Sequence, residues 1–357
     1  MDAKATPLLE FIKDNQKNQF VIPIYQRLYS WEKEQCKQLW DDIIKIGGND
    51  KMDGHFIGFI LYVLDGIAHS GNTLLIIDGQ QRLTTITLLL TALKNHLSDK
   101  EIEKHYLINS DKDGDKKFRL ILSESDKDTL LYLIDKDRRK PSELSLKIVE
   151  NFELFEEWIR KNTGKLETIF KGLKKLTIVW IALTKKEDDP QLIFESMNSK
   201  GMELTQTDLI RNYIVMETEA EKQEVFYNKH WRAMEEDFKQ NEKQNEKQDK
   251  KLFDRFVRHY LTIKTGKIPN INRVYVAFKD YQQERGIEIE ALLQDLQKYC
   301  RYFCQIAFKK EADKDLNKAL GFLVDLDMDV VYPLLLGLYS DYSDGRLSSR
   351  ILPLLSL

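Results

Sequence analysis

The chain contains the run Leu74-Leu75-Ile76-Ile77-Asp78-Gly79-Gln80-Gln81-Arg82, in which four apolar residues lead through one carboxylate and one glycine into a helical pattern. The pattern predicts a buried strand that ends near Ile77 and an apolar helix from Leu83 to Leu97. The first N–H groups of a helix have no partner within it and favour an anion. Gly79 lets a ligand approach the backbone closely, and Arg82 offers a fork of donors that suits phosphate oxygens. The run therefore predicts an anion site at a strand–turn–helix corner.

The two kinds of polar side chain in this corner predict different roles. Asp78 would repel a bare phosphate, so its expected role is to hold Mg²⁺ or to orient a water molecule. Gln80 and Gln81 are neutral and can bond a base, a ribose or a phosphate. The residues alone leave an alternative equally open, namely a plain structural corner in which Asp78 caps the helix and pairs with Arg82.

The pattern on either side of this corner predicts an α+β protein. Further strands are predicted at 20–24, 56–64 and 176–183, helices at 30–46, 125–134 and 142–162, and a hairpin across 106–122. From Pro190 onward the pattern is almost entirely helical. We therefore expect a mixed α/β domain over residues 1–188 and an all-helical domain over residues 189–357.

A second polar cluster lies in Ile22-Pro-Ile-Tyr-Gln26-Arg27-Leu-Tyr-Ser30-Trp31, where a short strand again leads into a helix. Ser30 is a candidate N-cap. The alternative interpretation of the cluster is an ordinary packed corner, and the residues alone favour that interpretation.

A third cluster lies in the segment 194–208. Gly201 stands where a helix C-cap is expected, and Thr205 with Asp208 forms a pattern like a capping box. Capping does not explain why three further polar residues gather at this bend, and these are Glu195, Asn198 and Lys200.

Charge and composition exclude several classes of protein. A net charge of −3 excludes a globally basic nucleic-acid coat protein, and three cysteines cannot form a disulfide framework. No apolar run approaches the roughly 18 residues that span a bilayer, and no export segment precedes the first strand. We therefore expect a cytoplasmic protein without a membrane partner. Local basic sets at 138–140 and at Arg255, Arg258, Lys264 and Lys267 are candidates for DNA contact.

The three clusters, in this order, resemble the N-terminal domain of GmrSD-type modification-dependent restriction endonucleases. The resemblance rests on IPxYQRxYSW, DGQQRLTT and FESMNSKGxxLTxxDLIRNY, and it covers about residues 7–215. That domain is similar in fold to the ParB/sulfiredoxin-like superfamily. The resemblance implies a module that binds and hydrolyses NTP with Mg²⁺ in a bacterial antiphage restriction system acting on modified DNA.

The resemblance also implies roles for individual residues. Asp78, Gln81 and Arg82 would be catalytic, and Asp78 would hold the metal. The residues that it implies in nucleotide binding are Gly79, Gln80, Gln26, Arg27, Asn198, Lys200 and Glu195.

The chain departs from the long members of this family, in which a C-terminal His-Asn-His domain cuts DNA. None of its six histidines stands in such a pattern. We therefore expect the nuclease on a separate chain or in a part missing from this one. Helical C-terminal domains commonly dimerise, so a homodimer is a further candidate assembly. Two other functions stay open, namely a sensing subunit that binds nucleotide or modified DNA without turnover and docks on a nuclease, and a ParB-like nuclease that cuts at Asp78.

Overall fold

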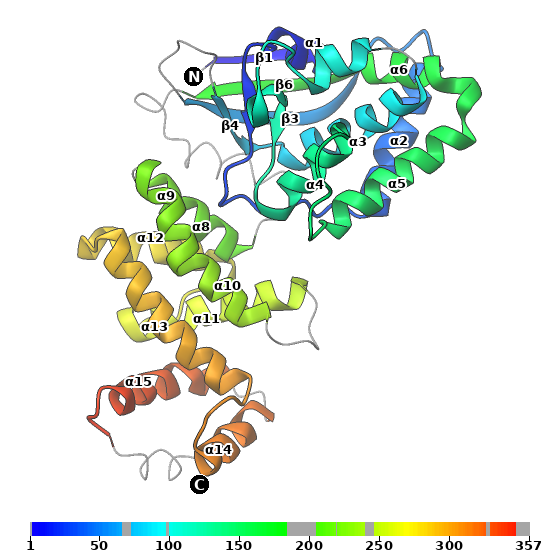
Figure 1. Cartoon of the computed structure of the whole chain (residues 1–357). Helices are drawn as coiled ribbons and strands as arrows, with labels where there is room; N and C mark the ends of the chain where they lie inside the picture. The colour runs from blue at the N-terminus through cyan, green and yellow to red at the C-terminus, as the bar shows by residue number, and fades with distance from the viewer. Residues whose placement is uncertain are drawn as a thin grey trace. The chain divides into compact units, whose positions relative to one another are not determined.

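The computed structural model describes residues 2–65, 73–97, 100–183, 205–218, 220–239, 246–325 and 329–347. The chain divides into two compact units, Met1–Met197 and Asn198–Leu357 (Figure 1). A sheet with helices forms the first unit and helices alone form the described part of the second, so the predicted α+β class is confirmed. The domain boundary predicted at residue 188 falls within 184–204, outside the described residues.

The described part of the first unit is built on a six-stranded sheet with the order β1-β6-β3-β4-β2-β5. Its strands are β1 (Asp2–Pro7), β2 (Gln19–Val21), β3 (His55–Asp65), β4 (Thr73–Asp78), β5 (Leu120–Ile121) and β6 (Leu176–Leu183). Strand β2 runs parallel to both β4 and β5, whereas β3 is antiparallel to β4 and parallel to β6. The carboxyl ends of β4, β2 and β5 therefore meet at one edge of the sheet.

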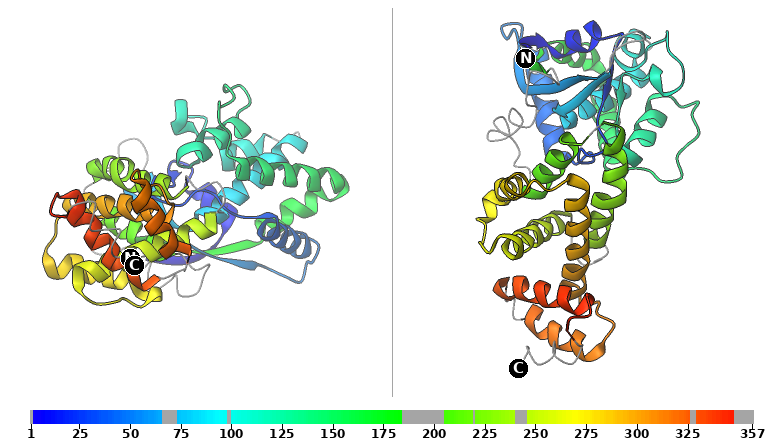
Figure 2. Two further views of the ribbon diagram at one scale, coloured as in Figure 1. Left: turned by 90° about the horizontal axis from the view of Figure 1, so that it is seen from below. Right: turned by 90° about the vertical axis from the view of Figure 1, so that its left-hand side faces the viewer.

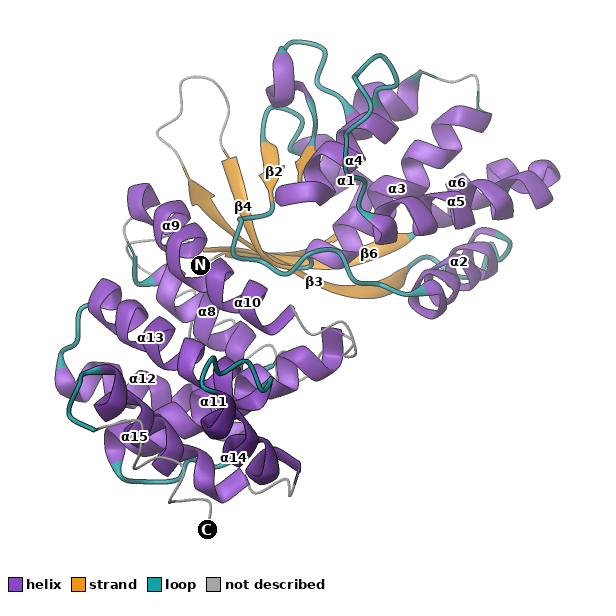
Figure 3. Ribbon diagram, turned by 60° about the horizontal axis from the view of Figure 1, so that its bottom comes forward, coloured by secondary structure: helices purple, strands orange, loops and turns teal. Residues whose placement is uncertain are grey.

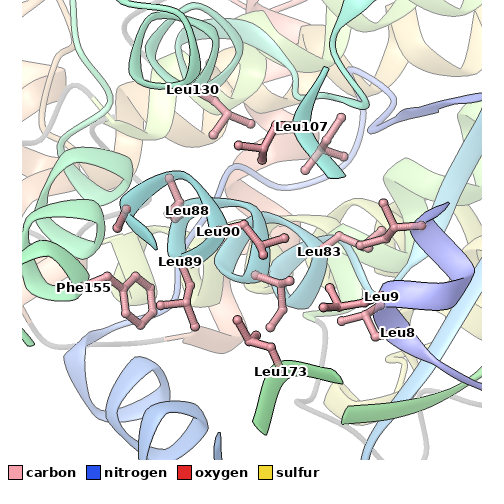
Figure 4. Packing of buried hydrophobic residues seen from close by; sticks show 14 of the residues in the cluster. Leu8, Leu9, Leu83, Leu88, Leu89, Leu90, Leu107, Leu130, Phe155 and Leu173 are labelled. Carbon is pink, nitrogen blue, oxygen red and sulfur yellow. The ribbon is translucent and has the colours of Figure 1, made fainter. Parts of the chain in front are cut away.

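Helices pack against one face of this sheet (Figure 3). They are α1 (Leu8–Asp14), α2 (Lys33–Gly47), α3 (Gln80–His96), α4 (Glu124–Ile134), α5 (Leu146–Lys161) and α6 (Leu166–Lys174). Helix α3 is the centre of the core, because nearly all its residues from Gln80 to Leu93 are buried. Figure 4 shows its leucines among Leu8, Phe155 and Leu173 from the surrounding elements. Each fully buried apolar side chain stabilises the fold by about 1.5–3 kcal/mol.

Two predicted elements differ from the structure. The hairpin expected across 106–122 forms only in part, because a π-helix (Glu103–Leu107) and a 3₁₀-helix (Gly114–Lys117) occupy part of the segment. One antiparallel bridge joins Ile108 and Phe118, and β5 pairs with β2 instead. Helix α2 begins at Lys33 rather than after Ser30, with a capping box between Glu32 and Gln35.

The described part of the second unit consists of helices, which can be followed in both views of Figure 2. The longer ones are α8 (Gln206–Met216), α9 (Ala220–Phe226), α10 (Arg232–Lys239), α11 (Glu246–Thr265), α12 (Val274–Arg285), α13 (Ile289–Ala307), α14 (Lys314–Asp325) and α15 (Tyr332–Ser343). The rings of Phe238, Phe256 and Phe303 pack together at its core, with centroids 5.5–6.2 Å apart. The capping box predicted at Thr205 and Asp208 is confirmed.

Among the residues described, no helix combines the length and the apolar character that crossing a bilayer requires.

Candidate functional site

The candidate site lies at the edge where β4, β2 and β5 end. Helix α3 begins two residues after β4 ends at Asp78, and α4 begins at Glu124, soon after β5 ends at Ile121. The loop 22–31 leaves β2 between them. In α/β sheets, ligands bind outside the carboxyl ends of the parallel strands. The N-termini of α3 and α4 lie at this edge, because each helix begins soon after its strand ends. The N-terminus of a helix favours an anion.

Gly79 makes the sharp turn from β4 into α3. Its φ of +95° lies in the region that side chains other than glycine avoid. A Cβ at this position would stand 2.9 Å from the carbonyl oxygen of Phe59 and 3.0 Å from Cγ1 of Ile60. The turn therefore requires glycine both for its backbone and for its close contact with β3.

Two of the predicted glutamines bond to each other. The Gln80 side chain donates from Nε2 to Oε1 of Gln26 over 3.3 Å, and Gln26 donates to the Ile77 carbonyl over 3.3 Å. Both side chains are buried, and Gln80 is only 6 % exposed. The structure therefore joins the first two sequence clusters into one site, with Gln26 and Gln80 as the link between them.

Gln81 also fixes the loop 22–31. Its side chain donates from Nε2 to the Leu28 carbonyl over 3.1 Å and accepts from the Ser30 N–H over 2.8 Å. Both ends of the amide are thus engaged in a residue that is 6 % exposed. The geometry favours a positioning role for Gln81.

Tyr29 joins the same loop to three helices through hydrogen bonds. Its hydroxyl lies 2.8 Å from Oγ1 of Thr85 on α3 and accepts from Nδ2 of Asn151 on α5 over 3.1 Å. Its backbone N–H donates to Asp126 on α4 over 2.6 Å. Burial raises the pKa of the Tyr29 hydroxyl well above its usual value. The hydroxyl is therefore a neutral structural group at physiological pH.

Asp78 and Arg82 point to the more open side of the corner. Nη2 of Arg82 lies 3.4 Å from Oδ2 of Asp78, and Nη1 donates to the Ile57 carbonyl over 3.0 Å. The side chains are 22 % exposed for Arg82 and 30 % for Asp78, unlike the buried glutamines. A charged ligand that approaches the start of α3 can therefore reach this pair.

Gly58 provides the space in which the Arg82 guanidinium lies. A Cβ on Gly58 would stand 1.8 Å from Nη1 of Arg82, and the glycine has a φ of +114°. The pairing of β3 with β6 shifts register here, between Phe56 and Phe59. Gly58 is not among the residues that the sequence motifs predict, although a glycine inside an apolar strand is a signal for a bulge.

Arg27 lines a small cavity on the other side of the corner. The volume open to a water molecule is about 10 Å³, close to the minimum that one water needs. Its lining residues are Ile22, Arg27, Tyr29, Gln80, Gln81, Thr84, Leu122, Ser123 and Asp126. A nucleotide is far too large for this space, and nucleotide contact by Gln26 and Arg27 stays a prediction.

A metal site in the described part of the chain would depend on Asp78 and on the ligand. No three His, Cys, Asp or Glu side chains there gather in a way that could hold a metal ion. Mg²⁺ usually keeps several waters and binds through one or two carboxylates together with substrate phosphates. A single accessible carboxylate at a phosphate site therefore fits Mg²⁺ brought in with a nucleotide.

Three residues of the third predicted cluster, Glu195, Asn198 and Lys200, fall within 184–204 and lie outside the described residues. Several cations of the basic sets pair with carboxylates. Arg138 pairs with Asp115, and Lys264 pairs with Asp295. DNA contact by these sets stays a prediction.

Arg255 and Arg258 of the second basic set share one carboxylate, that of Asp329. Their charge is therefore partly balanced within the helical unit.

A comparison with protein families matches residues 8–215 to the GmrSD restriction endonuclease, N-terminal domain. The match covers more than half of the chain and includes the loop 22–31 and the corner 78–82. A search of curated proteins finds no match.

Proposed function

Because the chain belongs to the family of the GmrSD restriction endonuclease N-terminal domain, we propose that its first unit binds a nucleoside triphosphate at Asp78–Arg82 and hydrolyses it with Mg²⁺. The family implies a role in restriction as a defence against phages. Within such a system, this chain would couple nucleotide turnover to a nuclease that acts on modified DNA.

The accessible pair of Asp78 and Arg82 at the start of α3 carries this proposal. The long contact of 3.4 Å between them is weak enough for Arg82 to exchange Asp78 for a phosphate oxygen. The N–H groups of α3 stand beside the pair and add donors for the same anion. The site therefore combines the positive charge, the backbone donors and the carboxylate that a triphosphate with Mg²⁺ requires.

Hydrolysis needs only a few groups, because phosphoryl transfer depends mainly on positioning and on neutralising charge. Bound Mg²⁺ would neutralise charge on the phosphates. Asp78 would hold that ion, and Arg82 would bond the oxygens of the terminal phosphoryl group. Water would then attack the terminal phosphorus as the bond to the bridging oxygen breaks, releasing phosphate and a nucleoside diphosphate.

The bonding of Gln81 favours a second candidate function. If both ends of its amide fix the loop 22–31, this side chain cannot orient the attacking water. The site would then bind nucleotide without turnover, and the chain would act as a sensing subunit that docks on a separate nuclease. No comparable observation favours a ParB-like nuclease.

The proposal is tested by calorimetry with each of the four NTPs in Mg²⁺, together with an assay of phosphate release. We expect Arg82→Gln to weaken NTP binding by about tenfold or more, because a charged donor to phosphate is lost. Asp78→Asn should remove the effect of Mg²⁺ on binding and abolish phosphate release.

The matched control is Arg232→Gln, which breaks an Arg–carboxylate pair with the same spacing along a helix in the second unit. That variant should bind NTP like the wild type. Binding without phosphate release would select the sensing function. Failure of the wild-type protein to bind any NTP would contradict both functions.

A further inference from the structure

Three donors on one face of α11 converge on a single carboxylate. Nε of Arg255 lies 2.7 Å and Nε2 of His259 lies 2.8 Å from Oδ1 of Asp329. Nη1 of Arg258 lies 3.4 Å from Oδ2 of the same residue. The three donors share a helix face, because residues three and four apart are neighbours there. Asp329 belongs instead to the 3₁₀-helix Asp329–Val331, so one helix carries the whole donor set.

Other groups also hold these donors in place. The His259 ring stacks on the Tyr332 ring, with centroids 5.3 Å apart and planes inclined by 12°. The guanidinium carbon of Arg255 lies 5.8 Å from the centroid of the same tyrosine. Nε of Arg258 donates to the Pro269 carbonyl over 2.8 Å. The donor set therefore has supports besides the carboxylate and can keep its arrangement when another anion replaces that group.

The donor set carries more positive charge than its carboxylate balances. Burial lowers the pKa of His259, so its ring is neutral near pH 7 and two guanidinium groups face one carboxylate. The side chains are 33 % exposed for Arg255, 26 % for Arg258 and 33 % for Asp329. The 3.4 Å contact of Arg258 is also long for a charged hydrogen bond. An anion from solution can therefore reach these donors and compete with the carboxylate.

Further cations extend the donor set along the helix and into the next loop. Lys251 is exposed one turn before Arg255, on the same face of α11. From Lys251 to Arg258 the helix rises about 10 Å, which matches about three phosphate steps of roughly 3.4 Å on one DNA strand. The loop after α11 adds Lys267 and Arg273, which are both exposed. This line of cations suits a regular line of phosphates.

We propose that this face of α11, with Arg255 and Arg258 at its centre, binds the phosphate backbone of DNA, and that Asp329 occupies the position of one phosphate when DNA is absent. A guanidinium group matches phosphate oxygens with a planar fork of donors. Evenly spaced cations favour an evenly spaced backbone over the irregular acidic surface of a protein. Asp329 is then an internal competitor that lowers the affinity for DNA. This surface lies in the second unit and does not depend on nucleotide binding by the first.

The test follows binding of a fluorescent DNA duplex to the full chain by anisotropy, between about 50 mM and 200 mM salt. Arg255→Gln/Arg258→Gln should weaken binding about tenfold and reduce the salt slope by about two, because two phosphate contacts are lost. Asp329→Asn should strengthen binding, since it removes the competing anion. A purely structural ion pair does not predict these opposite changes.

The controls use an arginine–carboxylate pair near the C-terminal end of α15. Arg346 lies 3.5 Å from Asp341 in the same unit. Arg346→Gln and Asp341→Asn therefore make the same kinds of charge change away from the proposed surface. Both variants should bind DNA nearly like the wild type.

Lys251→Gln provides a further test at an exposed position, in case a variant at the ion pair fails to fold, which thermal unfolding would show. It should reduce the salt slope by about one. Unchanged DNA binding by the folded double variant, or weaker binding by folded Asp329→Asn, would overturn the proposal. So would an unchanged slope in Lys251→Gln.

Calorimetry with inorganic phosphate distinguishes DNA from a free anion as the ligand. If the double variant loses phosphate binding but keeps DNA binding, the surface serves a free anion and the proposal is wrong. If the wild type binds no DNA at about 50 mM salt, the proposal is also wrong, and the nucleotide binding proposed for the first unit is unaffected.

Discussion

Two glycines determine the local geometry of the candidate site. Gly79 makes the turn at the start of α3, and Gly58 leaves the space that the Arg82 guanidinium fills. Of the residues implied by the sequence, the structure leaves Asp78 and Arg82 accessible and buries Gln26, Gln80 and Gln81. The sequence motifs predict all five as site residues. They do not predict which of the five are buried, because burial here depends on hydrogen bonds to the distant loop 22–31.

Replacement of Gly58 tests whether this space matters. We expect Gly58→Ala to cost about 1–3 kcal/mol in backbone strain and to push the Arg82 guanidinium from its place. Calorimetry should show weakened NTP binding, and thermal unfolding should report the loss of stability. Gly114→Ala is the control, because Gly114 also has a positive φ but a Cβ there meets nothing within 4 Å. Equal NTP affinity in the two alanine variants would contradict the assigned position of Arg82.

At the scale of elements, the site depends on the bonding of the loop 22–31 to helices α3, α4 and α5. Tyr29→Phe removes the hydroxyl that bonds Thr85 and Asn151. Leaving these buried groups with fewer partners should reduce the free energy of unfolding by about 1–3 kcal/mol. Urea unfolding followed by fluorescence measures this loss. Tyr342→Phe, which removes a hydroxyl from a half-buried tyrosine of the second unit, should change stability much less, and an equal loss would contradict the role of these hydrogen bonds.

The elements also show what the sequence could predict. Strand β6 was predicted with its bounds, and β4 and α3 to within a few residues, because their apolar runs are long and uninterrupted. Strand β1 was missed, since its sequence Asp2–Pro7 carries little apolar pattern and pairs only at the sheet edge. The start of α2 was misplaced because the cap forms at Glu32, whose N–H donates to the Gln35 side chain, and not at Ser30.

At the scale of the whole molecule, the second unit carries a buried histidine that makes its stability depend on pH. Burial lowers the pKa of His259 on α11, although the Asp329 carboxylate beside its ring acts in the opposite direction. Below about pH 6.5 the unfolded chain therefore binds a proton at this histidine that the folded chain does not. The contribution of His259 to stability is fully present above that pH and declines as the pH falls towards the folded pKa.

Hydrogen exchange of the α11 amides at about pH 7 and about pH 5.5, corrected for the intrinsic rates, measures this effect. We expect the wild type to lose more protection on acidification than His259→Gln does. Burial raises the pKa of Asp237 and Asp254, which acts in the opposite direction, but both chains contain these residues and the comparison cancels them. An identical loss in the two proteins would show that His259 is not responsible.

The assignment of the chain to a restriction family rests on a match over residues 8–215, and the chemistry proposed for it rests on one accessible pair in the first unit. Calorimetry of the wild-type protein and of Arg82→Gln with the four NTPs in Mg²⁺ tests that claim most directly. The account predicts that at least one NTP binds the wild type and that Arg82→Gln weakens this binding by about tenfold or more. Equal binding by the two proteins, or no binding by the wild type, would contradict it.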